Sequence, residues 1–274
     1  MSNYKSLLYE KAEPNIGIVT FNTPERLNAI TAQRLDELEA VLTEVEADKQ
    51  LGALILTGGE GRAYCVGLDL ELLDRAFYDI PYFESVIHRI NGIVLRLEAL
   101  RIPTIAAVNG FARAGGFEIS MGCDFIVMAD EAQIGDVHTD AGVLPAVTSM
   151  RLARRVGTQR AKEIIWTARW MDGPQAVASG LALWSVPRAQ LRAKAVEFAA
   201  SMSSKPGPCI AANKSVFQMS VDQPIEQGVA NEIAVFVKFM TDEPYGKEGY
   251  AAYREGREPF WKLAGATAVT APRA

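Results

Sequence analysis

Short apolar runs alternate with helix-like segments over the first two thirds of the chain, and this alternation restricts the fold more than any other feature. The runs are short and rich in apolar and β-branched residues, which predicts buried strands. They are 15–22 (NIGIVTFN), 51–58 (LGALILTG), 103–110 (PTIAAVNG) and 124–130 (DFIVMAD). Strands that alternate with helices are joined by right-handed crossovers. The sequence therefore predicts an α/β core.

The segments between these runs predict helices and loops. Thr31 is a candidate N-cap for a helix over 31–48, because a hydroxyl there accepts from a free amide of the first turn. The apolar residues that recur in this helix at core-facing spacing are Leu35, Leu38, Leu42 and Val45. A second helix is predicted over 82–100, a loop over 111–116 (FARAGG) and a short helix directly after that loop.

The last third of the chain is mostly helical in pattern. Asp172 and Gly180 bracket a short helix with a start and a stop signal, and longer helical stretches follow. No linker rich in glycine, serine or proline divides the chain. We therefore expect an α/β core over residues 1–200 and a helical C-terminal region over 201–274.

Composition excludes several classes of protein. The 28 basic and 33 acidic residues among 274 give a net charge of −5, whereas nucleic-acid binders usually carry a basic excess. No dense basic run suggests a membrane surface, and no apolar run reaches the roughly 18 residues of a membrane span. The three cysteines, Cys65, Cys123 and Cys209, lack metal-site spacing. Because the N-terminus also lacks a signal-peptide pattern, we expect a cytoplasmic protein.

The stretch Gly110–Asp124 (GFARAGGFEISMGCD) places a carboxylate, Glu118, just behind Gly115 and Gly116. The first amides of a helix have no internal partner, and glycine lets a ligand approach them closely. Such amides stabilise a negative oxygen, and a nearby carboxylate can move a proton. The loop Val66–Asp69 (VGLD) forms a similar junction. Two plainer interpretations stay open: the glycines are turn residues, and Glu118 interacts only with its own helix dipole.

These residues resemble the crotonase superfamily, also called the enoyl-CoA hydratase/isomerase family. The resemblance covers nearly the whole chain. The matching segments occur in the family's order and spacing, and they are NTPERLNAI, ALILTGGEGRAYCVGLDL, IPTIAAVNGFARAGGFEISMGCDFIVMADEAQIG, GVLPAVTSMRLARRVG and KEGYAAYREGREPFW.

The resemblance implies a crotonase-like spiral of repeated ββα units, with C-terminal helices that assemble a homotrimer or a dimer of trimers. It implies a coenzyme A thioester as ligand, with no separate cofactor. It places the oxyanion hole at the amides of Leu68 and Gly115 and a catalytic acid at Glu118. The positions matched to substrate binding are Arg26, Leu27, Ala29, Val66, Gly67, Asp69, Leu70, Gly116 and Asp140.

The sequence departs from the family at one catalytic position. The family's hydratases use a second glutamate, and alignment on Gly142 and Pro145 places His138 there. A histidine titrates near neutral pH and can act as acid or base. Asp136 or Asp140 could orient its ring.

We expect an enzyme that forms an enolate of a coenzyme A thioester, and the preferred prediction is an enoyl-CoA hydratase. An enoyl-CoA isomerase, an acyl-CoA hydrolase or C–C lyase, and a non-catalytic acyl-CoA binder are the alternatives. No metal is expected, because two histidines leave few ligands.

The remaining polar and aromatic candidates have plainer interpretations. His88 is expected on a surface, Cys65 in packing, and the basic cluster 151–157 on a solvated helix face. Four aromatic residues could line an acyl pocket or pack the core, and these are Phe77, Tyr78, Tyr82 and Phe83.

Overall fold

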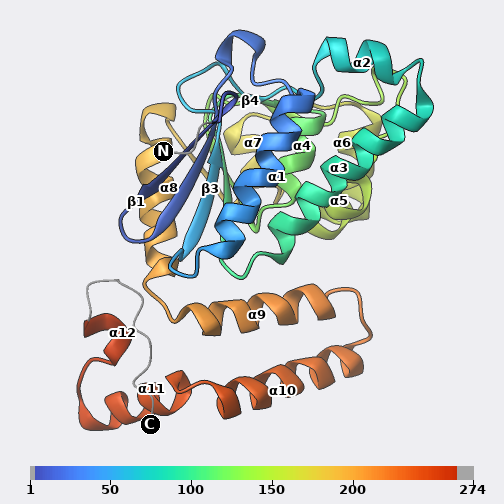
Figure 1. Ribbon diagram of the computed structural model, residues 1–274. Coiled ribbons are helices and arrows are strands. Elements are labelled where there is room, and N and C mark those ends of the chain that lie inside the picture. The colour runs from blue at the N-terminus through green and yellow to red at the C-terminus, as the bar shows by residue number, and fades with distance from the viewer. Residues whose placement is uncertain (1–3, 264–274) are drawn as a thin grey trace.

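Two β-sheets organise the core of the computed structural model, which describes residues 4–263 (Figure 1). The larger sheet has the strand order β1-β2-β3-β5-β7-β9, and only the β1–β2 pair is antiparallel. The smaller sheet has the order β4-β6-β8 and is parallel. The strands are β1 Leu7–Ala12, β2 Ile16–Phe21, β3 Ala53–Thr57, β4 Ala63–Cys65, β5 Thr104–Val108, β6 Phe111–Arg113, β7 Phe125–Ala129, β8 Ile134–Gly135 and β9 Trp184–Val186.

Successive strand pairs divide between the two sheets. The first strand of each pair (β3, β5, β7) joins the large sheet and the second (β4, β6, β8) joins the small one, and helices follow each pair. This repeat is the predicted spiral of ββα units. Residues 111–113 were expected in a loop, and that expectation is wrong. Three residues are too few to show alternation, but β6 gains a parallel partner on each side.

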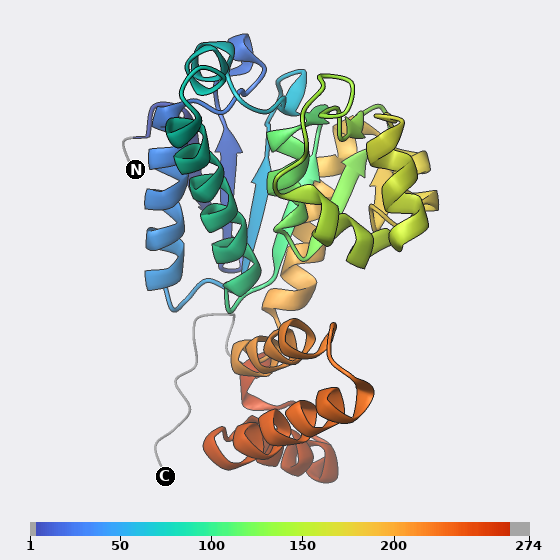
Figure 2. The same ribbon diagram turned by 90° about the vertical axis from the view of Figure 1, so that its right-hand side faces the viewer.

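Helices cover both faces of the large sheet. Helices α1 and α3 lie side by side on one face and α8 lies on the other (Figures 1 and 2). The helices are α1 Ala32–Ala47, α2 Leu70–Ala76, α3 Ile80–Ala99, α4 Gly115–Met121, α5 Thr148–Val156, α6 Thr158–Trp166, α7 Gly173–Ala178, α8 Arg188–Ser203, α9 Gly207–Ser220, α10 Ile225–Asp242, α11 Tyr245–Glu255 and α12 Phe260–Leu263, with a 3-10 turn, η1, at Pro24–Arg26.

The first long helix forms as its sequence predicts. The Thr31 side chain accepts from the amide of Arg34 at 3.1 Å, a cap of a kind that contributes about 1 kcal/mol. All four predicted core positions of α1 are buried: Leu35, Leu38, Leu42 and Val45. The strand β1 was not predicted, because only its first residue, Leu7, is buried and its pattern carries little apolar signal.

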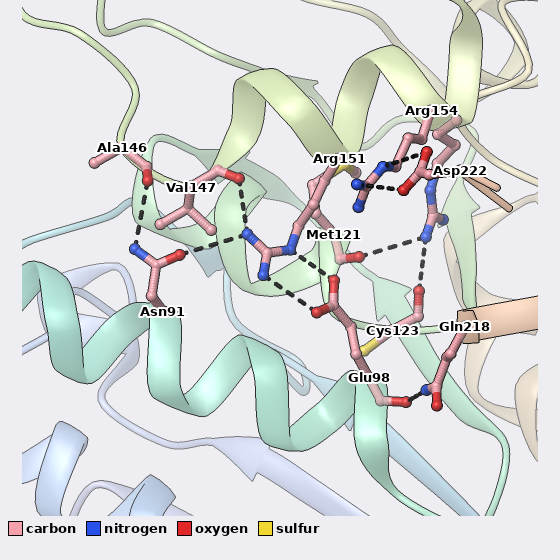
Figure 3. Close-up of polar contacts among 11 residues, drawn as sticks. Asn91, Glu98, Met121, Cys123, Ala146, Val147, Arg151, Arg154, Gln218 and Asp222 are labelled. Atoms are coloured by element: carbon pink, nitrogen blue, oxygen red, sulfur yellow. Dashed lines mark hydrogen bonds and ion pairs between the residues drawn. The ribbon is translucent and has the colours of Figure 1, made fainter. Parts of the chain in front are cut away.

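The C-terminal helices stand apart from the sheets (Figures 1 and 2). Neither α9 nor α10 has a buried residue. Polar contacts attach α9 to the core. Lys214 pairs with Asp124 at 2.7 Å. Gln218 donates to the backbone oxygen of Glu98, as Figure 3 shows. Across residues 4–263 no helix combines the length and apolar character that a membrane crossing requires.

Candidate active site

A cavity of about 770 Å³ opens where α2 and α3 face the start of α4 and the loop after β8. Most residues predicted for the site line it, although they come from distant parts of the chain. These residues are Arg26, Leu27, Ala29, Val66, Leu68, Asp69, Leu70, Gly115, Glu118 and His138. The structure therefore places the predicted oxyanion hole and both predicted acid–base groups around one space.

The two glycine junctions meet at this cavity. A Cβ added to Gly115 would lie 2.7 Å from Cδ1 of Ile30 and 3.2 Å from Cα of Gly67. Ile30 forms backbone hydrogen bonds with both neighbours of Leu68. Its amide donates to the oxygen of Gly67, and its oxygen accepts from the amide of Asp69. Within residues 4–263, the amides of Leu68 and Gly115 have no backbone acceptor. Two free amides thus lie beside the cavity, one in the loop Val66–Asp69 and one at the first residue of α4.

A buried arginine holds the loop that supports Leu68. Arg34 is fully buried in α1, and its guanidinium donates to the backbone oxygens of Asn28 and Ser6, the latter at 3.0 Å. The side chain of Asn28 donates to the backbone oxygen of Ala63 at 2.9 Å. Sequence reasoning missed Arg34, although an arginine next to the apolar stripe of a helix is a signal that could have identified it.

The backbone before Gly115 is strained. Ala114 has φ 45° and ψ −121°, a conformation that residues with a Cβ rarely adopt. Gly116 is required for packing, because a Cβ there would lie 1.9 Å from the backbone oxygen of Cys65. Neither Gly116 nor Gly67 lines the cavity. The two glycines of the opening stretch therefore differ: Gly115 leaves an amide free, and Gly116 lets α4 contact β4.

Glu118 is a buried acid. All seven residues of α4 are buried, and the Glu118 side chain is 3% exposed. Desolvation raises the pKa of Glu118 to about 7, against the opposing effects of His138 and of the backbone amides of Val147 and Ala146. Within the described residues its Oε1 atom has no hydrogen-bond partner. A carboxyl group with a pKa near neutrality can both give and take a proton at physiological pH.

His138 faces Glu118 and is held from behind by Asp136. Its Nε2 lies 4.0 Å from Oε1 of Glu118, and its Nδ1 lies 2.8 Å from Oδ1 of Asp136. Burial lowers the pKa of His138, but the Asp136 hydrogen bond and the charge of Glu118 outweigh burial, so the pKa is raised. Asp140, the other possible orienting acid, is exposed and outside the cavity lining. The ring is therefore oriented by Asp136.

Two of the predicted binding residues, Arg26 and Asp69, also interact with groups of the protein itself. The Asp69 side chain caps α2 by accepting from the amide of Glu71 at 3.1 Å. Arg26 lies 3.4 Å from Asp69 and remains about half exposed at the cavity mouth, where a cation can meet an anionic ligand.

Several plainer interpretations agree with the structure. His88 is exposed beside Glu84, and Cys65 is buried with its pKa raised to about 11 by desolvation, which makes it a poor nucleophile. Of the four aromatic candidates, Phe77 and Phe83 line the cavity, with ring centroids 5.6 Å apart. Tyr78 is almost fully exposed and does not line it.

The basic cluster 151–157 is not simply a solvated face, so that expectation is wrong in part. Arg151 binds Glu98, and Arg155 donates to the backbone oxygens at the end of α4. Sequence reasoning also missed cavity residues to which it assigned no role, because only the fold brings them together. They are Arg113, Ile87, Ile90, Val143 and Ala146. Within residues 4–263, no group of three or more metal-binding side chains is assembled.

Comparisons with known proteins show the family to which the chain belongs. The enoyl-CoA hydratase/isomerase family model matches residues 11–264. A probable enoyl-CoA hydratase of Mycobacterium bovis is 34% identical over 93% of this chain and 97% of its own length. The short-chain-enoyl-CoA hydratase of Clostridium acetobutylicum is 31% identical over 92% and 96%. The crystal structure of an enoyl-CoA hydratase from Bacillus anthracis, 28% identical, superposes with a TM-score of 0.88 over 94% of this chain and 99% of its own. The chain therefore belongs to the enoyl-CoA hydratase/isomerase family.

Proposed function

We propose that this protein hydrates a 2-enoyl-CoA thioester to a 3-hydroxyacyl-CoA. One observation carries the proposal: Glu118 and His138 face each other at 4.0 Å in a cavity that Leu68 and Gly115 also line. An acid and a base on either side of one water molecule, beside two free amides, suit addition of water to a double bond conjugated with a thioester.

The reaction then runs in two linked transfers. His138, supported by Asp136, takes a proton from water, and the water oxygen bonds to the β-carbon. The electron pair of the double bond moves toward the thioester, whose oxygen becomes an enolate held by the amides of Leu68 and Gly115. Protonated Glu118 gives its proton to the α-carbon. Water has then added across the double bond, and the proton now on His138 returns to Glu118 through solvent.

The two catalytic groups share one proton in the active form. Glu118 has a pKa of about 7, the pKa of His138 is raised above its ordinary value, and the charge of each acts on the other, so the two groups titrate as a pair. The states Glu-COOH/His and Glu-COO⁻/HisH⁺ hold the same number of protons, so pH does not separate them. With two protons on the pair no base remains, and with none no acid remains. We therefore expect a bell-shaped dependence of turnover on pH.

The rest of the cavity supports a coenzyme A thioester as substrate. Arg26, Leu27 and Ala29 line the cavity, and we propose that the coenzyme A portion binds against them. Apolar side chains also line the cavity, including Phe77 just after α2 and Phe83 and Ile90 of α3, and they suit an acyl chain.

Turnover of crotonyl-CoA tests the proposal. We expect loss of the enoyl absorbance and formation of 3-hydroxybutyryl-CoA. Crotonyl-CoA that binds but stays unchanged would contradict hydration of this short acyl group. Assays with longer 2-enoyl-CoA esters would then decide whether the protein hydrates any 2-enoyl-CoA. Conversion of a 3-enoyl-CoA to a 2-enoyl-CoA without water uptake would instead identify an isomerase, and release of free coenzyme A a hydrolase or a lyase.

A further inference from the structure

A network of side chains from α3 and α5 holds the backbone at Ala146 and Val147 (Figure 3). Arg151 of α5 binds Glu98 of α3 through two bonds, Nε to Oε1 at 2.6 Å and Nη2 to Oε2 at 3.1 Å. This two-bond pairing fixes the plane of the guanidinium as well as its position. Its Nη1 donates to the backbone oxygen of Val147 at 3.1 Å.

Asn91 of α3 extends this network to the preceding peptide. Its Nδ2 donates to the backbone oxygen of Ala146 at 3.4 Å, and its Oδ1 accepts from Arg151 at 3.4 Å. The same Nδ2 also donates to the backbone oxygen of Ile87 on its own helix at 3.2 Å. The oxygen of Ala146 is thus held by Asn91 of α3, and the oxygen of Val147 by Arg151 of α5, which is itself bound to Glu98 of α3.

The geometry of the peptide bond carries this restraint to the active site. In a planar trans peptide the C=O and the N–H point in opposite directions. The oxygen of Ala146 shares its peptide with the amide of Val147, so holding that oxygen toward Asn91 directs the amide away from α3. Ala146 and Glu118 line the same cavity, and α5, which begins directly after Val147, packs against α4. The amide of Val147 lies on the Glu118 side of this contact, where an N–H favours the charged form of the carboxylate.

We propose that Asn91 positions Glu118 by fixing the peptide that joins Ala146 to Val147, and that Arg151 and Glu98 support it by holding the Asn91 side chain and the next carbonyl group. None of the three side chains lines the cavity, so they act through the backbone and not on the substrate. The proposal concerns the carboxyl group itself and holds whether or not water addition is the reaction. Its consequence for turnover rests on the proposed function.

Other groups also act on Glu118 and must stay constant in a test. His138 and Asp136 act on it from the loop after β8, and the Cys65 thiol couples to it from β4. Arg113 of β6 lines the same cavity. Arg151 carries a charge, so its removal would raise the pKa of a nearby carboxyl group even without positioning. Asn91 is neutral, and its replacement by a neutral residue isolates the positioning effect.

The direct test is titration of Glu118 by ¹³C NMR in protein labelled at the glutamate carboxyl carbon, with Glu118→Gln to assign the signal. In Asn91→Leu, which keeps similar volume, we expect the midpoint to rise by about half a pH unit or more. Asn91→Ala should give the same direction. The control is Ser85→Ala, which removes an exposed bond to the Tyr82 oxygen of the same helix; its midpoint should equal that of the unchanged protein.

An unchanged midpoint in both folded Asn91 variants would overturn the proposal. If Arg151→Gln raised the midpoint while both Asn91 variants did not, charge alone would be the explanation, and positioning would again be excluded. Where turnover is present, Asn91→Leu should lower kcat more than it changes KM and should move the pH profile upward. If no hydration is found but the Glu118 titration midpoint shifts, the proposed function is contradicted and the positioning of Glu118 still holds.

Discussion

The helix that carries Glu118 and the helices of the C-terminal region differ in how far their side chains are buried. All residues of α4 are buried, whereas α9 and α10 bury none. Large apolar side chains of the C-terminal region are open to solvent, including Phe217 at 74% and Phe236 at 62%. Close packing fixes the acid to within a narrow range of positions, while the C-terminal helices present a surface that residues 4–263 do not cover.

The buried helix α4 carries the proposed catalytic acid, whereas the exposed apolar side chains of the C-terminal helices are available for contact with another chain. The trimer implied by the family resemblance would cover apolar residues such as Phe236, and this stays a prediction that analytical ultracentrifugation can check. The chemistry we propose depends instead on groups of one chain, because Glu118 and His138 meet within it. The following changes test the two regions in order of expected effect.

The largest effect is expected for Glu118→Gln. The amide keeps the size of the side chain but cannot exchange a proton, so turnover should fall by about 100-fold or more. Affinity for a coenzyme A thioester should be nearly unchanged, because other cavity residues provide binding. Steady-state kinetics and calorimetric titration measure the two quantities. Equal loss of affinity and of turnover would assign Glu118 to binding.

Gly116→Ala should have the next largest effect, on stability. The new Cβ would lie 1.9 Å from the Cys65 oxygen, and neither backbone can move without disturbing the parallel strands. We expect a loss of about 3 kcal/mol in the free energy of unfolding. Urea denaturation followed by circular dichroism measures it. A variant as stable as the unchanged protein would show that α4 is less tightly packed than described.

Asp136→Asn should lower turnover by about tenfold, equivalent to ~1.4 kcal/mol of transition-state stabilisation. The charge of Asp136 stabilises the imidazolium of His138, so its removal lowers the pKa of His138. Both limbs of the bell-shaped pH profile should then move to lower pH. The measurement is kcat against pH. Limbs that move upward would mean that Asp136 does not act through the His138 ring.

The smallest effect is expected in the C-terminal region, for Gly228→Ala in α10. The new Cβ would lie 3.6 Å from Ser220, an ordinary contact. Because alanine favours the helix over glycine, we expect a gain of about 0.5–1 kcal/mol. The same urea experiment compares it with Gly116→Ala. A loss comparable to that of Gly116→Ala would contradict the contrast between the two regions.

Sequence patterns predicted the elements that depend on local periodicity or end signals. The apolar stripe of α1 and its Thr31 cap followed directly from spacing. The short strand β6 could not be predicted in this way, because its three residues owe their conformation to partners far along the chain. The family resemblance placed Glu118 and His138 in one site. Spacing alone could not have brought their segments together.

The less predictable parts of the site lie outside the motifs. The choice of Asp136 over Asp140 depends on how the loop after β8 turns, and both residues have the same separation from His138. The Asn91 contact with Ala146 depends on the packing of α3 against the start of α5. Such contacts arise from tertiary structure and leave no trace in the spacing of residues.

The most direct test of the central claim compares the pH dependence of kcat for crotonyl-CoA hydration in the unchanged protein and in His138→Gln. If Glu118 and His138 share one proton, the unchanged protein should give a bell-shaped profile near neutral pH, and the variant should lose one limb together with most of its turnover. A His138→Gln enzyme with an unaltered rate and profile would contradict the account.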